Sequence, residues 1–187
     1  MASTRVFVGA SLDGFIAGPN DELDWLSGGS SEGQSAGPSE GQAEAHKSFS
    51  EFFAQIGAVL MGRRTYDVVC GMKAPWPYGD TPMLIATSRP LVAKRPSVRA
   101  VRGSIAEVVE QAKQVAGSRD VYIDGGRLIR AALDAGLVDD ITVTIVPIVI
   151  GAGIPLFAGV TRHHPLQLLG QRTIAGAAVE LKYRPRR

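Results

Sequence analysis

The chain has 187 residues, 45% of them hydrophobic, so residues 1–187 are expected to form a single domain with a substantial core. Its formal net charge of +2 at pH 7 excludes the strongly basic surface that nucleic acid requires, and no apolar run reaches membrane-spanning length. A single cysteine, Cys70, excludes an intrachain disulfide, which together with the lack of a signal-peptide layout favours a cytoplasmic protein.

The first half of the chain alternates strand patterns with helix patterns. Apolar and β-branched residues predict strands over Arg5–Ala10, Ala58–Met61 and Pro82–Thr87. Apolar residues at helical spacing predict helices over Ala43–Ile56 and Arg64–Cys70. The Gly- and Ser-rich composition of the intervening segment predicts a mobile loop, not a domain linker, over Ser27–Gly41.

The second half continues the alternation and then changes character. Ser104 and Glu107 form the capping-box pattern of a helix start, and that helix is expected to end near Gly117. A further helix is expected over Arg127–Ala135. Strands are predicted over Val98–Val101, Asp120–Ile123 and Asp140–Ile150. At the end of the chain, an antiparallel hairpin is predicted from Leu166–Ile174 and Ala178–Tyr183.

This order of elements predicts an α/β fold. Strands that alternate with helices favour a mostly parallel central sheet with helices on both faces, to which the C-terminal hairpin adds antiparallel strands. The β-rich edge and the hairpin are also compatible with a homodimer. In open sheets of this kind, ligands bind outside the carboxyl ends of the strands, so the residues that follow each strand are the first place to look for function.

Polar and glycine-rich segments follow four of the predicted strands, at Ser11–Gly18, Gly62–Tyr66, Thr87–Pro90 and Asp124–Arg127. Three of these segments contain arginine, and one adds adjacent hydroxyl groups, which is the chemistry that binds a phosphate monoester. In the last segment, Gly125 and Gly126 leave the backbone open to a ligand just before a helix N-terminus. A tight turn without a ligand would use the same glycine pair. The three segments together favour a nucleotide site.

The chain resembles the dihydrofolate reductase superfamily in four motifs that occur in the family's order. Met61–Tyr66 is similar to its M-G-R-x-T-[YW] motif, and Ser11–Ala17 is similar to the S-L-D-G-x-I-A segment of its riboflavin-biosynthesis branch, the RibD C-terminal reductase domains. Ile123–Gly126 resembles V-E-G-G, with Asp for Glu, and Val138–Phe157 resembles the V-D-E…P…G-x-G-x-P-L-F stretch. The resemblance covers nearly the whole chain and implies a dihydrofolate reductase-like fold.

The resemblance also implies an NADPH-dependent reductase. In the family, the G-R-x-T motif binds cofactor phosphates, hydroxyl residues at a strand end hold the adenosine end, and the double glycine, with a cis peptide, adjoins the nicotinamide and pyrophosphate. Arg89 is then placed for the 2′-phosphate, which would select NADPH over NADH. The cofactor-binding residues that follow are Ala10, Ile16, Gly18, Gly62, Arg63, Arg64, Thr65, Thr87, Ser88, Arg89, Asp124, Gly125, Gly126, Arg127, Leu128 and Ile129.

The proton donor and the substrate contacts have several candidates. Folate reductases carry a carboxylate on the first helix, and His46 is the residue nearest to that position here. It is either a substrate contact or proton donor, or a solvent-facing helix residue. Asp13 is a second candidate acid, although an Asp-Gly pair is also typical of a turn. Trp25 is a candidate wall for a planar substrate or a packing residue, and Thr144 is a further expected substrate contact.

Three functions remain open at this stage. The first is an NADPH-dependent reductase of a small heterocycle, resembling 5-amino-6-(5-phosphoribosylamino)uracil reductase, although Phe15 stands where riboflavin reductases often carry a basic residue. The second is a dihydrofolate reductase, which the missing helix carboxylate disfavours. The third is a nucleotide-binding protein that kept the fold and lost catalysis. No Cys/His pattern of a zinc deaminase is present, so no metal is expected.

Overall fold

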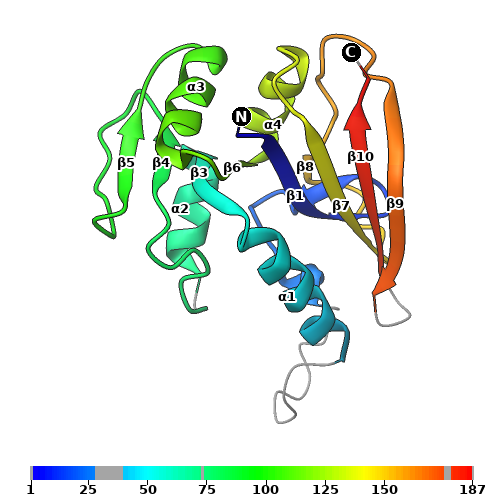
Figure 1. Cartoon of the computed structure of the whole chain (residues 1–187). Coiled ribbons are helices and arrows are strands. Elements are labelled where there is room, and N and C mark those ends of the chain that lie inside the picture. Colours follow the sequence, from blue (N-terminus) through cyan, green and yellow to red (C-terminus); the bar gives the residue numbers. More distant parts are fainter. Residues whose placement is uncertain (1, 28–39, 73, 175–177, 187) are drawn as a thin grey trace.

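An eight-stranded sheet, in the order β5-β4-β3-β6-β1-β7-β10-β9, organises the structure (Figure 1). The computed structural model describes residues 2–27, 40–72, 74–174 and 178–186. The strands are β1 (Thr4–Ser11), β2 (Phe15–Ala17), β3 (Ile56–Gly62), β4 (Met83–Ala86), β5 (Val98–Val101), β6 (Asp120–Asp124), β7 (Asp140–Val146), β8 (Ile154–Pro155), β9 (Leu166–Ile174) and β10 (Ala178–Pro185).

The sheet is parallel from β5 to β7, and β10 then pairs antiparallel with both β7 and β9. The expected mostly parallel sheet with a closing antiparallel hairpin is therefore confirmed. The short strands β2 and β8 pair with each other outside the main sheet. The sequence did not predict this pair, because three residues and two residues are too few to show a strand periodicity.

Helices cover both faces of the sheet, as predicted. Figure 1 shows α3 (Ile105–Ala116) and α4 (Gly126–Asp134) on one face and α1 (Glu40–Phe53) and α2 (Arg63–Gly71) on the other. A 3-10 helix, η1 (Asp24–Ser27), follows β2. None of the helices in the described ranges is long and apolar enough to cross a membrane.

The alternation of side chains along β3 builds a separate core on each face. Ala58 and Leu60 belong to the hydrophobic cluster that contains residues of α3 and α4. Val59 and Met61 belong to the cluster that contains residues of α1 and α2. The four residues divide in this way because successive side chains of a strand point to opposite faces of the sheet. All four are fully buried, since helices cover both faces. This central strand is therefore fixed on both sides, together with the residues that follow it.

Two of the sequence boundaries differ from the structure for identifiable reasons. The last long strand ends at Val146 instead of Ile150, because Pro147 has no N–H to give to a sheet ladder. The helix expected from Ala43 begins at Glu40, so the last residues of the predicted Gly/Ser loop are helical. Residues 28–39 of that predicted loop lie outside the described residues.

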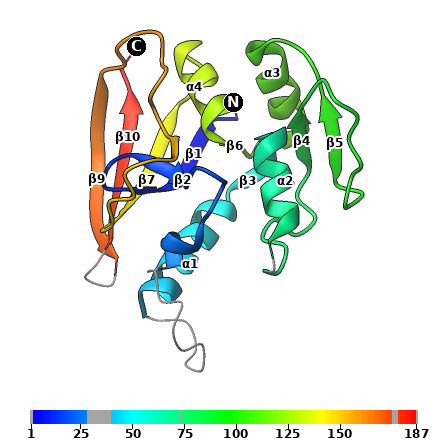
Figure 2. The ribbon, with the colours of Figure 1, turned by 180° about the vertical axis from the view of Figure 1, so that it is seen from behind.

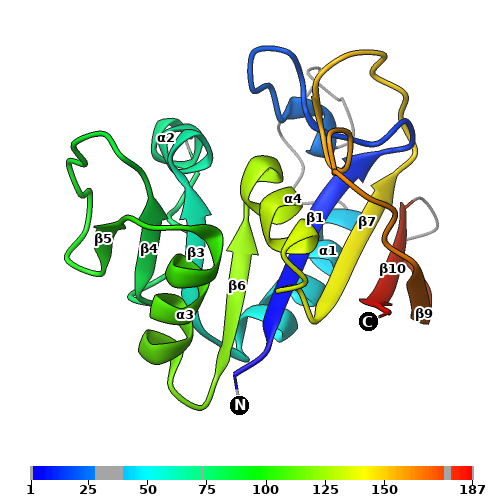
Figure 3. The ribbon, with the colours of Figure 1, turned by 90° about the horizontal axis from the view of Figure 1, so that it is seen from above.

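The strand order brings the ends of separate parallel strands to one edge of the sheet. Figure 3 shows β1, β3, β4 and β6 pointing in the same direction. Seen from behind, in Figure 2, their carboxyl ends face the viewer, with α2 and β2 nearest. Because β6 lies between β3 and β1, the segments that follow these three strands are neighbours although they are far apart in the sequence.

The capping box at the start of α3 gives a prediction about stability. The Ser104 hydroxyl accepts from the Glu107 N–H, and the Glu107 carboxylate accepts from the Ser104 N–H. Ser104→Ala should lower the free energy of unfolding by about 1 kcal/mol, because it leaves a helix N–H without its acceptor. Urea denaturation measures this loss. Ser118→Ala, in the exposed turn after the same helix, is the control, and equal losses in the two variants would contradict the prediction.

Candidate active site

A cavity of about 990 Å³ lies at the carboxyl ends of the parallel strands. It is lined by segments that follow β3, β4 and β6 and by residues of β1, β2, β8 and α1. Its volume is at the upper end of the range typical of small-molecule sites. The cavity therefore occupies the position that the sheet topology predicts for a ligand.

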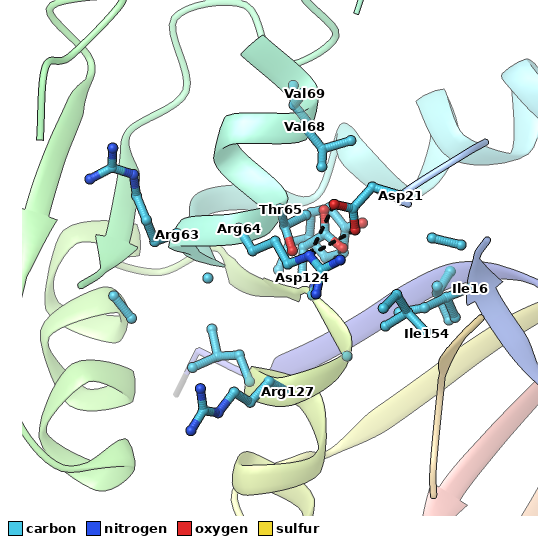
Figure 4. A pocket seen from close by; sticks show the side chains of 18 of the residues that line it. Ile16, Asp21, Arg63, Arg64, Thr65, Val68, Val69, Asp124, Arg127 and Ile154 are labelled. Carbon is cyan, nitrogen blue, oxygen red and sulfur yellow. Dashed lines mark hydrogen bonds and ion pairs between the residues drawn. The ribbon is translucent and has the colours of Figure 1, made fainter. Parts of the chain in front are cut away.

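The lining residues divide into two chemically distinct parts. The arginine half contains charged and hydroxyl residues from the start of α2, the end of β4 and the start of α4, namely Arg63, Arg64, Thr65, Thr87, Ser88, Arg89 and Arg127. The apolar half is formed by Phe7, Leu23, Leu26, Phe49, Val68, Val69, Met72, Pro77 and Tyr78. Figure 4 shows Arg63 and Arg127 pointing away from Val68 and Val69. One end of the cavity thus suits the anionic part of a ligand, and the other end suits an apolar part.

Two helices start in the arginine half. Their N-cap residues are Gly62 for α2 and Gly125 for α4, and neither provides a side-chain hydrogen bond to the helix. The first-turn N–H groups therefore have no side-chain cap, and the residues that carry them line the cavity. Free N–H groups and the positive end of the helix dipole attract phosphate, and here two such ends serve the same cavity.

Gly125 allows these two helix starts to touch. Its φ is +97°, and a Cβ at this position would collide with the Thr65 hydroxyl. A Cβ at Gly126 would lie 2.9 Å from the Ile16 side chain and 3.3 Å from the Pro155 carbonyl oxygen. A side chain at Gly125 is therefore opposed both by the backbone conformation and by Thr65, whereas one at Gly126 would require the end of the Ile16 side chain to move. The expected cis peptide is wrong, because the bond is trans. The alternative expectation, a backbone conformation closed to residues with a side chain, agrees with the positive φ of Gly125.

Two of the arginines share one acidic partner. Arg63 Nε lies 2.8 Å from Asp67 Oδ1, and its Nη1 donates to the Pro90 carbonyl at 2.7 Å. Arg89 Nη2 lies 3.7 Å from Asp67 Oδ2. Asp67 thus holds both guanidinium groups beside one another, at the end of the cavity that follows β4. Arg127 is exposed and makes no ion pair among the described residues.

Another ion pair joins the two sides of the cavity. Arg64 Nε, at the start of α2, lies 2.8 Å from Asp21 Oδ1, in the segment after β2, and Figure 4 shows this pair over the cavity. Asp21 has a φ of +67°, a conformation that aspartate adopts more readily than most residues. The positive charge of Arg64 is therefore matched within the protein.

A buried carboxyl group reaches the cavity from the end of β6. Asp124 Oδ1 accepts from the Gly125 N–H at 2.7 Å, and Oδ2 lies 3.4 Å from the Tyr78 hydroxyl. Burial raises the pKa of Asp124 to about 6, opposed by the hydrogen bonds from Gly125 and Tyr78. The residue is partly accessible only because the cavity reaches it. A carboxyl that titrates near neutral pH in a pocket is typical of functional sites.

The apolar half is built around packed aromatic rings. The rings of Phe7 and Phe49 meet edge to face with centroids 5.6 Å apart, and Phe49 and Tyr122 meet in the same way at 6.3 Å. The Tyr122 hydroxyl donates to the Phe7 carbonyl at 2.9 Å. Burial raises the pKa of Tyr78 far above its usual range, so this hydroxyl stays protonated. Phe7, Phe49, Tyr78 and Tyr122 line the cavity together with Asp124.

Most of the expected cofactor residues meet at this cavity. Those that line it are Ile16, Gly62, Arg63, Arg64, Thr65, Thr87, Ser88, Arg89, Asp124, Gly125, Gly126, Arg127 and Leu128. Ala10 and Ile129 are instead packed in the hydrophobic core. Gly18 lies in the turn closed by its bond with Glu22.

The two candidate proton donors are placed elsewhere. Asp13 accepts from the N–H groups of Ile150 and Gly151. Hydrogen bonds from Ser11 and from these N–H groups hold the pKa of Asp13 below its usual value, so it is ionised at neutral pH. His46 is exposed on α1. Neither residue is among those that line the cavity.

The two expected substrate contacts also lie outside the cavity lining. The Trp25 indole is buried and donates to the Glu22 carbonyl at 3.1 Å, which gives it a structural role. Thr144 pairs with Gly9 of β1 and Glu180 of β10 within the sheet.

Sequence reasoning missed Tyr78, Phe49 and Asp21 as cavity residues. Phe49 had a helical core spacing, Asp21 occurs in a turn, and Tyr78 follows a Pro-rich segment, so none carried a signal of a site. Asp124 was selected as part of the glycine motif, but its burial depends on Tyr78 and Tyr122 and is visible only in the structure.

Comparison with known proteins gives a consistent match. The family described as the RibD C-terminal domain matches residues 3–179. The uncharacterized protein YwjB of Bacillus subtilis is 28% identical over 180 residues, which is 96% of each chain. A putative riboflavin biosynthesis protein from a Shewanella species has a TM-score of 0.81 at 24% identity, with 99% of both chains covered.

A more distant solved structure has a more specific description. It is a diaminohydroxyphosphoribosylaminopyrimidine deaminase/5-amino-6-(5-phosphoribosylamino)uracil reductase from Thermotoga maritima, with a TM-score of 0.68 at 14% identity. The alignment covers 99% of this chain and 57% of that one. At such identity, the two solved structures support the fold, which is the one that the sequence motifs predicted.

The contact between Gly125 and Thr65 gives a second prediction. Gly125→Ala should destabilise the protein by at least about 1–2 kcal/mol, because alanine is strained at positive φ and its methyl would collide with the Thr65 hydroxyl. Gly71→Ala is the control, since a Cβ there meets no atom within 4 Å and alanine favours a helix. Urea denaturation compares the two. A Gly125→Ala variant as stable as the parent would show that the helix starts do not need this glycine.

Proposed function

The chain belongs to the RibD C-terminal domain family, and on this premise we propose that it is an NADPH-dependent reductase of a small heterocycle. The family implies a reductase, and the solved structure from Thermotoga maritima is described as one. The observation that carries the proposal is the meeting of two uncapped helix starts, several arginines and one buried carboxyl at a single cavity. A reductase needs a phosphate-binding end and a reaction end, and this cavity has both.

The residues of the arginine half fit a dinucleotide that carries an additional phosphate. The first-turn N–H groups of α2 and α4, with Thr65, would hold the pyrophosphate. Thr87 and Ser88 would hold the adenosine end. Arg63 and Arg89 both form ion pairs with the Asp67 carboxylate. Their guanidinium groups are therefore close enough for one phosphate group to contact both. These two arginines would therefore bind the 2′-phosphate, the group that distinguishes NADPH from NADH.

NADPH supplies a hydride when it is bound, and the reduction of a double bond in a heterocycle also consumes one proton. We assign the proton donor to Asp124, because Asp124 is among the residues that line the cavity and Asp13 is not. A carboxyl with a pKa of about 6 is still partly protonated near neutral pH. Tyr78 and the Gly125 N–H fix its orientation.

The overall proposal is tested by binding and turnover together. Fluorescence titration with NADPH and with NADH measures cofactor binding. NADPH oxidation in the presence of a panel of aminopyrimidines and dihydrofolate measures the reaction and its substrate class. Binding without turnover of any compound in the panel would favour a nucleotide-binding protein that lacks catalysis.

The role of Asp124 predicts a pH dependence. The protonated carboxyl is the active form, so kcat/KM should fall as pH rises through about 6, approaching tenfold for each further pH unit. Asp124→Asn should lower kcat by about 100-fold, the lower end of what a general acid contributes, and should abolish this pH dependence. The variants Asp13→Asn and His46→Gln are the comparison. If either of them removes the pH dependence and Asp124→Asn does not, the assignment is wrong.

The role of Arg89 predicts cofactor selectivity. A hydrogen bond to a charged group contributes about 1.5–3 kcal/mol, which corresponds to roughly 10- to 150-fold in affinity. The Arg89 side chain is 66% exposed, so Arg89→Ala should weaken NADPH binding by about tenfold, the lower end of this range. NADH binding should change much less. The exposed Arg99 on β5 gives the control variant Arg99→Ala. Equal losses for NADPH and NADH in Arg89→Ala would exclude contact with the 2′-phosphate.

A further inference from the structure

We infer that the molecule reduced in this cavity is an uncharged, planar nitrogen heterocycle that carries no phosphate group. The inference rests on the proposed reductase function and narrows its substrate class. The supporting observation is the distribution of charge in the cavity. Every arginine of the lining either belongs to the arginine half or is already bound to other protein groups.

The apolar half offers no cation to an anionic substrate. Among the described residues, the whole cavity lining contains no lysine and no histidine, and Arg130 is its one arginine outside the arginine half. Arg64 also lines the cavity, but a phosphate could bind it only in competition with Asp21, whose Oδ1 lies 2.8 Å from its Nε. Arg130 also lines the cavity, but its Nη1 donates to the carbonyls of Pro155 and Leu156 at 2.6 and 3.2 Å. A phosphate placed among the apolar residues would lose water and would have to compete with Asp21 for Arg64, or with the two carbonyl groups for Arg130, which is unfavourable.

The helix starts do not supply the missing partner. The N-termini of α2 and α4 both open on the arginine half, and the proposed cofactor would occupy them. The face of α2 that follows Thr65 along the cavity consists of Val68, Val69 and Met72, residues at helical spacing that present only apolar atoms. A second phosphate therefore finds no free helix N-terminus, and the guanidinium groups of Arg64 and Arg130 already have protein partners.

The polar groups that are present select a different kind of ligand. Asp124 becomes negative above a pH of about 6 and would repel a phosphate dianion across a cavity of low polarity. The same carboxylate accepts hydrogen bonds, so it favours the N–H or amino groups of a nitrogen heterocycle. Phe7 and Phe49 are among the lining residues, and aromatic rings suit contact with a planar molecule. Shape, charge and hydrogen bonding thus favour the same class of ligand.

The experiment compares 5,6-diaminouracil with the same base carrying a phosphoribosyl group. Calorimetric titration of the full chain in the presence of NADP⁺ gives both dissociation constants, and NADPH oxidation is measured in parallel. We expect the free base to bind at least tenfold more tightly. Equal or tighter binding of the phosphorylated compound overturns the inference, and so does the binding of neither compound. If the free base binds more tightly but neither compound is reduced, the cavity's preference for an uncharged base stands, and the reductase function fails.

Charge-insertion variants test the cause of the preference. Met72 lines the apolar half and is 46% exposed, so Met72→Arg adds a cation there without burying it. The phosphorylated compound should then bind at least tenfold more tightly than it does to the parent protein. Leu168→Arg, on the exposed face of β9, adds the same charge outside the cavity and should not change its affinity. Equal effects of the two variants would overturn the inference.

One further variant examines a cation outside the described residues. Lys73 follows Met72 in the sequence. We expect Lys73→Ala to leave the affinities of both compounds within about twofold of the parent, a difference of less than about 0.5 kcal/mol. A selective loss of the phosphorylated compound in this variant would show that the apolar half has a cation, and the inference would fail.

Discussion

The contact between the starts of α2 and α4 is the constraint on which the rest of the site depends. It exists because β6 is inserted between β3 and β1, so that the helices following β3 and β6 begin side by side. Gly125 makes the approach sterically feasible, since a Cβ would collide with the Thr65 hydroxyl. The same turn places Asp124 directly before the helix start. The anion-binding end and the buried carboxyl are therefore products of one local geometry, and neither can move without the other.

Charge in the cavity is arranged so that few positive groups are left unmatched. Asp67 pairs with Arg63 and Arg89, and Asp21 pairs with Arg64. Such partly exposed pairs contribute little to stability, so their main consequence is the orientation of the guanidinium groups. An incoming phosphate competes with these carboxylates for the arginines. The affinity of the arginine half for an anion thus depends on the difference between two free energies, that of the arginine–phosphate contact and that of the arginine–carboxylate contact it replaces. The acidic partners therefore matter as much as the arginines do.

The fold could be predicted from the sequence because its signals are local and repeated. The capping box at Ser104, the β-branched strands and the closing hairpin each specify an element, and their order specifies the sheet. The arginine-containing segments that line the cavity could be located for the same reason, since they follow strands. The reaction end could not, because it depends on contacts between distant residues. Tyr78 reaches Asp124 across 46 positions, and no local pattern in either segment indicates that contact.

The raised pKa of Asp124 shows that this end of the site reduces stability. A carboxyl whose pKa rises from 3.8 in the unfolded chain to about 6 in the folded protein favours the folded state most at low pH, where it is protonated in both states. The free energy of unfolding therefore decreases as pH rises from about 4 to 6, and at neutral pH the decrease amounts to about 3 kcal/mol. A well-packed neutral side chain would avoid it. The loss is instead offset by the two cores that flank β3 and β6, where Val121 and Ile123 are fully buried. A rigid sheet can therefore hold a carboxyl in surroundings that it would not occupy in a less constrained chain, and this raised pKa is what suits the group to release a proton near neutral pH.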